Sequence, residues 1–224
     1  MQTMSRRSFL LASLGVASLC LAGCGSGASG ASSTSAASAS AMPSSSASSC
    51  VTSASGEYAS GTHHATIEVE GYGAIKLELD ADVAPVTVAN FAKLVGEGFY
   101  DGLTFHRIIE GFMVQGGDPN GNGTGGSDEK IVGEFSDNGH PNSISHVRGT
   151  ISMARSQAYN SASSQFFIMQ ADSPSLDGQY AAFGHVTEGM DVVDAMCEAA
   201  RPTDNNGTIA AADQPRIASV KMDD

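Results

Sequence analysis

The sequence predicts a mainly β fold, a closed antiparallel β-barrel with two packed α-helices. Two observations predict it. After residue 60, most of the chain consists of short apolar segments separated by glycine, proline and asparagine, a pattern typical of strands joined by loops. Only two segments there show the 3.6-residue apolar period of an amphipathic helix. We expect the sheet to close on itself, because closure removes exposed strand edges.

The first predicted elements are a hairpin and a helix. HATIEVEGYGAIKLELD, residues 64–80, alternates apolar and polar side chains on both sides of a Gly-Tyr-Gly turn, as two paired strands do. APVTVANFAKLVGEG, residues 84–98, has Pro85 in a first-turn position and ends in glycines that stop a helix. Its apolar stripe predicts which face is buried: Val88, Phe91, Ala92 and Val95.

The remaining segments predict short strands, a second helix and a last strand. The helix is GMDVVDAMCEAA, residues 189–200, with Met190, Val193 and Cys197 on one face. The last strand is IASVKM, residues 217–222. The short strands before the helix are LTFHRII (103–109), FMVQGG (112–117), GTISMAR (149–155), SQFFIMQ (164–170) and YAAFGHV (180–186).

Residues 1–23 are typical of an export signal. They combine a basic start, a short apolar run and small residues before Cys24, and the run is too short for a typical membrane-spanning helix. The paired Arg6 and Arg7 in SRRSFL resemble a twin-arginine export signal. LAGC, which ends at Cys24, resembles the lipobox of bacterial lipoproteins, and this implies a lipidated cysteine as the new N-terminus. The alternative is a plain secretory signal with a chance cysteine.

Residues 24–60 predict a tether. They are rich in serine, alanine and glycine, and they bury too little apolar surface to offset the entropy of ordering. Residues 61–224 are then enough for one domain with a substantial core. We expect this domain to lie outside the cytoplasm, attached to the cell membrane through the lipid on Cys24.

The chain is acidic, with a formal charge of −13 at pH 7. Nucleic acid and anionic lipid head groups repel such a surface, so we expect no nucleic-acid partner and no basic membrane patch. Two cysteines remain in the mature chain besides the lipidated one. Export permits a disulfide between Cys50 and Cys197, and the alternative is two unpaired thiols with Cys197 in the core.

The glycine-rich run after residue 117 matches two ligand-binding patterns by spacing. Residues 118–129 fit the calcium-loop pattern D-x-[DN]-x-[DN]-G-x5-E at every specified position, but the helices that this loop needs on each side are missing. Gly121, Gly123 and Gly126 fit G-x-G-x-x-G, but an acidic segment follows where a phosphate-binding helix would begin. The six histidines show no zinc-ligand spacing. We therefore expect a polar surface loop, with no metal and no cofactor.

Arg107 is an unusual residue for a predicted strand. Alternation in FHRII places Phe105, Arg107 and Ile109 on one face, among large apolar groups. An arginine in such a place belongs either to a buried ion pair or to a cleft. The residues alone leave both alternatives open.

Four blocks, in the order FHRIIEGFMVQGGDPNGNGTGG, GTISMARS, SSQFFIM and LDGQYAAFG, resemble the cyclophilin-type peptidyl-prolyl cis-trans isomerases. The resemblance covers about residues 64–222 and implies a closed eight-stranded barrel. It also implies that Arg107 is catalytic and that the glycine-rich run is a surface loop. The residues that it implies bind substrate are Phe112, Met113, Gln115, Gly123, Ala154, Arg155, Gln165, Phe167, Leu176 and Tyr180.

Two positions depart from the best-known eukaryotic family members, and Arg155 stands where many members have asparagine, although arginine is common there in bacterial ones. Tyr180 replaces a histidine and Ser175 replaces a tryptophan, and the second change weakens the expectation of cyclosporin sensitivity. We expect a monomeric isomerase that accelerates X-Pro rotation in proline-containing segments of exported proteins. The alternative is a binding module or chaperone on the same barrel, which holds proline segments without turnover.

Overall fold

An eight-stranded sheet forms the framework of residues 50–224, the part of the chain that the computed structural model describes and that lies in one compact unit. The strand order is β10-β2-β3-β9-β7-β8-β5-β4, and every neighbouring pair is antiparallel. The strands are β2 (Thr62–Val69), β3 (Gly73–Asp80), β4 (Thr104–Ile109), β5 (Met113–Asp118), β7 (Thr150–Met153), β8 (Phe166–Met169), β9 (Ala182–Glu188) and β10 (Ile217–Met222). The mainly β prediction and the predicted strand segments are confirmed.

The prediction of a closed barrel is wrong, because the edge strands β4 and β10 form no ladder with each other. They meet only at an isolated bridge between Thr104 and Arg216. Beyond this bridge, the connection that leads into β10 covers the outer edge of β4. The Ile108 N–H donates to the Gly207 carbonyl and the Ile209 N–H donates to the His106 carbonyl, both at 2.9 Å. The edge groups of β4 are thus paired with a loop, and the sheet is a half-barrel.

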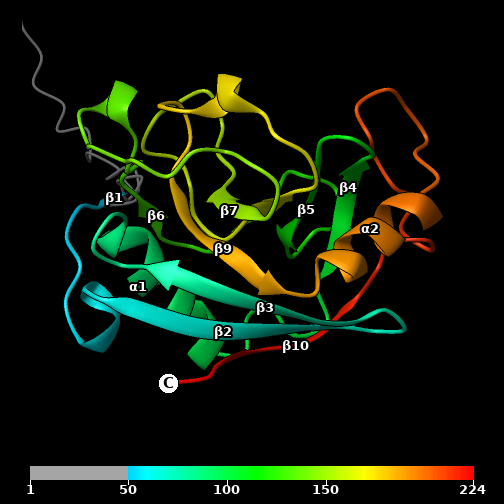
Figure 1. Cartoon of the computed structure of the whole chain (residues 1–224), viewed down its shortest axis with the longest axis horizontal. Helices are drawn as coiled ribbons and strands as arrows, with labels where there is room; N and C mark the ends of the chain where they lie inside the picture. The colour runs from blue at the N-terminus through cyan, green and yellow to red at the C-terminus, as the bar shows by residue number, and fades with distance from the viewer. Residues whose placement is uncertain (1–49) are drawn as a thin grey trace, which may run out of the picture. The chain divides into compact units, whose positions relative to one another are not determined.

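The two predicted helices are α1 (Pro85–Gly96) and α2 (Met190–Ala199). They lie at opposite ends of the sheet (Figure 1). All four residues of the predicted α1 stripe are buried, and so are Val193 and Cys197 of α2, whereas Met190 is partly buried. The apolar periodicity therefore identified the correct faces.

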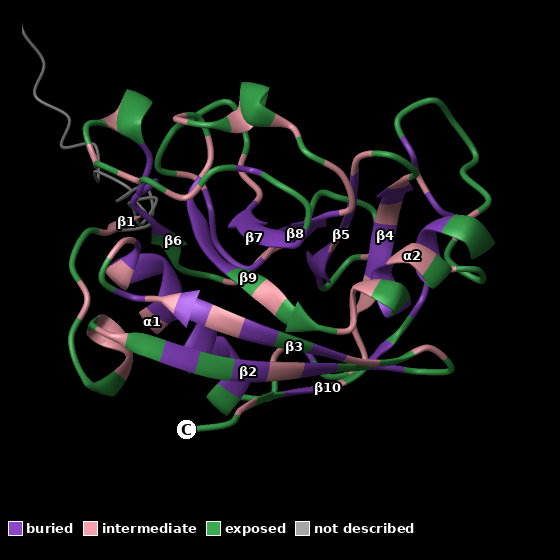
Figure 2. Ribbon diagram, viewed as in Figure 1, coloured by how far each residue is buried: buried purple, intermediate pink, exposed green. Residues whose placement is uncertain are grey.

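The core lies on the concave face of the sheet and is rich in aromatic rings. Phe91 of α1 packs against Tyr100, Phe166 and Phe183, with ring centroids 5.2–6.0 Å apart. Buried and exposed positions alternate along β2, whereas β7 and β8 are buried throughout (Figure 2). A strand buried on both faces needs a second cover, so the outer face of β7 and β8 is also packed.

The compact unit begins before residue 61, the boundary that the sequence predicted. Cys50–Val51 forms strand β1, which pairs in parallel with β6 (Lys130–Ile131). The hydroxyl of Tyr58 donates to the carbonyl of Asp224 at 3.1 Å. Apolar side chains of this segment pack on the core, and this contact orders residues that composition alone assigned to the tether.

The structure describes two of the four cysteines, Cys50 and Cys197, and tests only the predictions that concern residues from 50 onward. Cys50 and Cys197 are both free thiols, so the two do not form a disulfide in this structure. The predicted export signal, Cys24 and most of the predicted tether lie outside the described residues. Within residues 50–224, no helix has the length and apolar character needed to cross a bilayer.

A buried carboxylate caps the start of α1. The N-cap residue, Ala84, offers no side-chain acceptor. Glu134, which is 48 residues away from Val86 in sequence, accepts hydrogen bonds from the backbone N–H groups of Val86 and Thr87 and from the Thr87 hydroxyl, at 2.7–3.0 Å. This places a negative charge at the positive end of the helix dipole.

Glu134→Ala should destabilise the fold by about 2–3 kcal/mol, because it leaves two buried N–H groups without an acceptor. The melting temperature should fall by about 4–12 °C. Calorimetry of the purified domain measures both. Glu129→Ala is the matched control, because Glu129 forms an exposed ion pair with Lys93, and such pairs contribute at most about 1 kcal/mol. Equal losses in the two variants would contradict the role of Glu134.

Candidate functional site

A β-bulge in β4 turns Arg107 out of the core. Phe105 pairs with Gly116 and Arg107 pairs with Gln115, so His106 is an extra residue in β4. The bulge reverses the strict alternation that the sequence suggested. Phe105 is fully buried in the core, whereas Arg107 and Ile109 face the outer side of the sheet. The prediction that Phe105 shares a face with Arg107 is therefore wrong, and a cleft, not a buried ion pair, holds the arginine.

An apolar cluster separate from the core lies beside Arg107. Met113 of β5 and Phe167 and Met169 of β8 form its buried floor, and partly buried side chains complete it, namely Ile109, Phe112, Ala154, Leu176 and Tyr180. All of these except Ile109 and Met169 line a cavity of about 180 Å³ together with Arg107, Gln115 and Arg155. The structure thus brings together eight of the ten predicted substrate-binding residues with the predicted catalytic arginine. The pocket is apolar on its floor and has the guanidinium groups of Arg107 and Arg155 at its edge.

A chain of side-chain amides holds the guanidinium from one side. Nη1 of Arg107 donates to Oε1 of Gln115 at 3.2 Å, and Nε2 of Gln115 donates to Oε1 of Gln165 at 2.9 Å. Nε2 of Gln165 in turn donates to the Gly125 carbonyl at 2.8 Å. Each amide accepts a hydrogen bond on its oxygen and donates the next one from its nitrogen, so the orientation of each side chain depends on its neighbour. These three hydrogen bonds therefore connect the glycine-rich loop to the guanidinium of Arg107.

The loop before β10 holds the guanidinium from the other side. Nε of Arg107 donates to the Asn206 carbonyl at 2.7 Å. The carboxylate of Asp204 accepts the backbone N–H groups of Asn206 and Thr208 and so fixes this loop. Burial lowers the pKa of Arg107, but an arginine stays protonated in proteins. Within the described part of the chain, Nη2 has no hydrogen-bond acceptor, so it can donate to a bound molecule.

A second, polar pocket of about 260 Å³ adjoins the first and shares Gln115, Ala154 and Arg155 with it. It contains the two remaining predicted residues, Gly123 and Gln165. The Ala154 N–H donates to the Gln165 carbonyl, and no residue in the range 50–224 donates to the Ala154 carbonyl. That carbonyl can therefore accept an N–H from an extended peptide lying across the two pockets.

Arg155 stands in the wall between the pockets, with its guanidinium occupied by protein groups. Its Cζ lies 4.8–5.1 Å from the ring centroids of Phe135, Tyr159 and Tyr180. Its Nε donates to the Gln179 carbonyl at 2.9 Å. These contacts fix the wall of the site, in addition to any contact that Arg155 makes with a ligand.

The glycine-rich loop is a turn organised by Asp118. This buried carboxylate accepts backbone N–H groups from Asn120, Asn122 and Gly123 at 2.5–3.0 Å. Burial opposes ionisation, but these hydrogen bonds outweigh it and hold the pKa of Asp118 below its usual value. Glu129, the last position of the calcium pattern, instead pairs with Lys93. Among the described residues there is no group of three or more His, Cys, Asp or Glu side chains that could hold a metal.

Sequence reasoning missed three groups of the site. The Asn206 carbonyl is one, and His146 and Asp177, which pack beneath the apolar pocket, are the others. The run DNNG at residues 204–207 does signal a turn. Nothing in the run shows that this turn contacts Arg107, because Asn206 is 99 residues from Arg107 in the sequence.

Comparison with known proteins agrees with this geometry. A family model described as "Cyclophilin type peptidyl-prolyl cis-trans isomerase/CLD" matches residues 64–222. The chain belongs to the cyclophilin family. It is 48% identical over 122 residues to peptidyl-prolyl cis-trans isomerase B of Bacillus subtilis, which covers 54% of this chain and 82% of that protein. It is 46% identical over 142 residues to the peptidyl-prolyl cis-trans isomerase of Helicobacter pylori, covering 62% and 83%.

A solved cyclophilin shows the same fold. The chain is similar to a Cryptosporidium parvum cyclophilin-type isomerase, solved in the presence of the dipeptide Ala-Pro, with a TM-score of 0.63 and 30% identity. The match covers 72% of this chain and 99% of that one. The family and its named relatives make this cyclophilin a peptidyl-prolyl cis-trans isomerase, an enzyme rather than a binding module.

Proposed function

We propose that Arg107 catalyses rotation of X-Pro bonds by donating a hydrogen bond to the proline nitrogen in the twisted transition state. Amide resonance makes the barrier to rotation about 18–20 kcal/mol. As the bond twists, resonance is lost and the nitrogen regains a lone pair. The Nη2 group of Arg107 would interact more strongly with this nitrogen than with the planar amide, so the interaction would lower the barrier.

The apolar pocket supports this proposal because it suits a proline ring. The side chains of Phe112, Met113, Phe167 and Leu176, which line this pocket, would hold the ring still while the residue before it rotates. The Ala154 carbonyl would hold the extended chain across the wall. We assign the same role, contact with the substrate, to Phe112, Gln115, Gly123, Arg155, Gln165, Leu176 and Tyr180.

The hydrogen bond alone does not account for all of the catalysis. A hydrogen bond from a charged group is worth roughly 1.5–3 kcal/mol, or about 10- to 150-fold in rate. Positioning in a pocket that excludes water supplies the rest. No covalent intermediate forms, because rotation breaks no σ bond.

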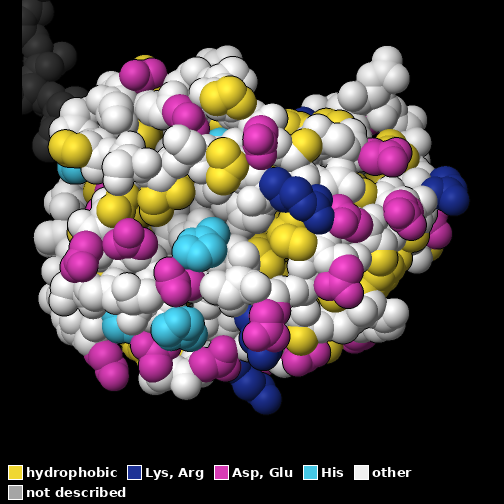
Figure 3. Space-filling view, in the orientation of Figure 1, with side chains coloured by type: hydrophobic (Ala, Val, Ile, Leu, Met, Phe, Trp, Pro, Cys, Tyr) yellow, Lys and Arg dark blue, Asp and Glu magenta, His cyan; other side chains and the backbone are white. Residues whose placement is uncertain are grey.

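We further propose that the enzyme acts as a monomer outside the cytoplasm, on proline-containing segments of exported proteins, and that a lipid on Cys24 attaches it to the membrane. The export-like residues 1–23 and the LAGC sequence support this proposal. The charge distribution agrees with it, since acidic side chains are scattered over the face in Figure 3 and no basic patch suited to anionic lipid appears there.

Arg107→Ala should fold normally and lose about 10- to 150-fold in kcat/KM on a short X-Pro peptide, with the loss mainly in kcat. Arg107→Lys should also be impaired, because an ammonium group lacks the planar fork that reaches Gln115, Asn206 and the substrate together. Arg201→Ala is the matched control, since Arg201 is exposed and hydrogen-bonds only to nearby carbonyls. Unchanged kcat in Arg107→Ala would remove Arg107 from its proposed role.

Cys24→Ala should release the protein from the membrane fraction or leave it unprocessed. The measurement is fractionation of cells that express the full chain, with mass spectrometry of the mature N-terminus. Cys50→Ala is the control and should stay with the membrane. A mature wild-type N-terminus without lipid would contradict the lipid anchor and would leave the isomerase activity unaffected.

A further inference from the structure

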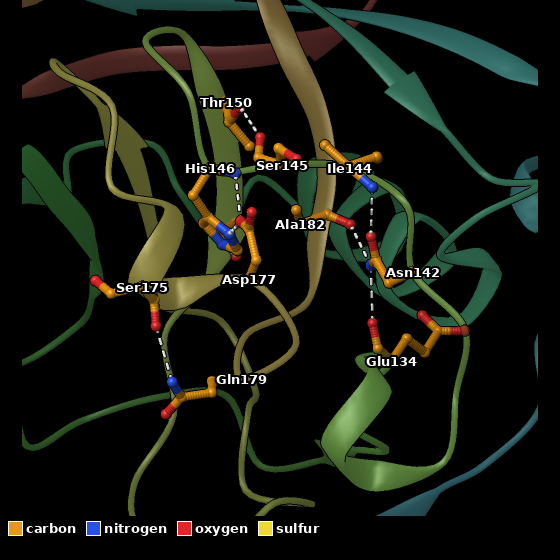
Figure 4. Close-up of polar contacts among 11 residues, drawn as sticks. Glu134, Asn142, Ile144, Ser145, His146, Thr150, Ser175, Asp177, Gln179 and Ala182 are labelled. Atoms are coloured by element: carbon orange, nitrogen blue, oxygen red, sulfur yellow. Dashed lines mark hydrogen bonds and ion pairs between the residues drawn. The ribbon is translucent and has the colours of Figure 1, made fainter.

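His146 is a buried histidine with a partner on each ring nitrogen. Its Nδ1 lies 2.9 Å from Oδ1 of Asp177, and its Nε2 lies 3.0 Å from Oγ of Ser152. Its backbone N–H donates to the same Asp177 oxygen at 2.7 Å. Figure 4 shows His146 and Asp177 facing each other from two different chain segments. The side chain of His146 is only 1% exposed.

The ring of His146 lies directly beneath the apolar pocket. It stacks on Phe167, with ring centroids 6.0 Å apart and planes at 18°. It meets the ring of Tyr180 edge-on at 6.5 Å. Asp177 follows Leu176 in the chain, so the Nδ1 contact ties down the segment that forms the pocket rim. One imidazole therefore contacts the floor of the pocket and fixes its rim.

The hydrogen bonds determine which form of the ring is present. Burial opposes ionisation of Asp177, but the hydrogen bonds from the backbone and ring of His146 outweigh it and keep the pKa of this carboxyl below its usual value. An ionised carboxylate only accepts, so Nδ1 of His146 must carry the proton. Nε2 is then an acceptor, and the Ser152 hydroxyl donates to it. Of the two neutral tautomers, only the Nδ1–H form satisfies both contacts.

The Ser152–His146–Asp177 arrangement has the order of a nucleophile triad, but it cannot act as one. Ser152 is completely buried in β7, between β8 and β9. Its hydroxyl contacts His146, and neither pocket of the site includes it. A nucleophile needs access to its substrate, so the arrangement serves another purpose.

We propose that His146 is a positioning residue that holds the proline pocket in its binding shape, and that it does so only as the neutral ring. The inference rests on the proposed use of the apolar cluster as the proline pocket. Protonation at Nε2 would make the Ser152 hydroxyl accept from the ring instead of donating to it, and no other described group lies in place to accept the hydroxyl hydrogen. It would also bury a positive charge under Phe167. The Asp177 segment and the floor would then lose their common support, and peptide binding would weaken.

The sign of the pH dependence follows from burial. Burial lowers the pKa of His146 below the ordinary histidine value, and the hydrogen bond and charge of Asp177 only partly oppose this. The neutral ring is therefore present above about pH 6.5 and is lost as the pH falls through the lowered pKa. The titratable side chains that face the ring are Asp177, whose pKa is lowered so that it stays ionised, and Tyr180. His106, beneath Gly123, also has a pKa lowered by burial, so a second titration can occur near the polar pocket.

The test is the pH dependence of KM and kcat for a short X-Pro peptide in the wild type and three variants. In the wild type, KM should be constant from pH 6.5 to 8 and should rise at lower pH while kcat changes little. His146→Asn has no titrating ring and no stacking, so KM at pH 7.5 should rise about 10-fold and the acid limb of KM should disappear. Asp177→Asn removes the charge that favours the protonated ring, so its acid limb should move to lower pH.

His185→Asn is the matched control, because His185 is exposed and lies 3.7 Å from the exposed carboxylate of Glu78. It should leave KM and its pH profile unchanged. A wild-type KM and an unchanged acid limb in His146→Asn would overturn the proposal, as would a loss confined to kcat. If His146→Asn does not fold, Asp177→Asn decides, and an unshifted acid limb there would overturn it. These effects on KM are distinct from the kcat loss expected for Arg107→Ala, so either proposal can fail alone.

Discussion

The extra residue in β4 is the constraint on which the proposed active site depends. With strict alternation, Arg107 would share a face with Phe105 and would enter a core of aromatic rings, where an unpaired guanidinium is very costly. The bulge at His106 separates the two, so that Phe105 packs inward and Arg107 faces outward within three residues. It also brings Arg107 into register with Gln115, and this pairing is the first link in the support of the guanidinium.

The same strands build both the core and the catalytic surface. In β5 and β8, side chains such as Val114 and Ile168 point to the core, and their neighbours Met113 and Phe167 form the pocket floor. Cross-strand pairs then run from Arg107 to Gln115, from Gln115 to Phe167 and from Phe167 to Ser152. A site on the face of a packed sheet is held more rigidly than one on loops, which suits a reaction that depends on orientation.

The sequence predicted the elements whose signals are local. Pro85 and the apolar stripe after it predicted α1, and the alternation around residues 71–73 predicted the β2–β3 hairpin, because each pattern lies within one element. The family resemblance supplied the site residues, and the structure brings them together around two adjoining pockets. Neither source could supply the bulge, since FHRII contains no glycine or proline to mark it. The Glu134 cap and the loop that closes the edge of β4 were also beyond prediction, because both join residues far apart in the chain.

We propose that Arg107 acts through a guanidinium oriented by Gln115, and a double-mutant cycle measures the coupling between these two residues. The measured quantity is kcat/KM for one X-Pro peptide in the wild type, Gln115→Ala, Arg107→Ala and the double variant. If the amide orients the guanidinium, Gln115→Ala should reduce kcat/KM in the wild type and should change it little once Arg107 is absent, a coupling of about 0.5–3 kcal/mol. Losses that simply add in the double variant would show that the two residues act independently, and Gln115 would then not orient the guanidinium.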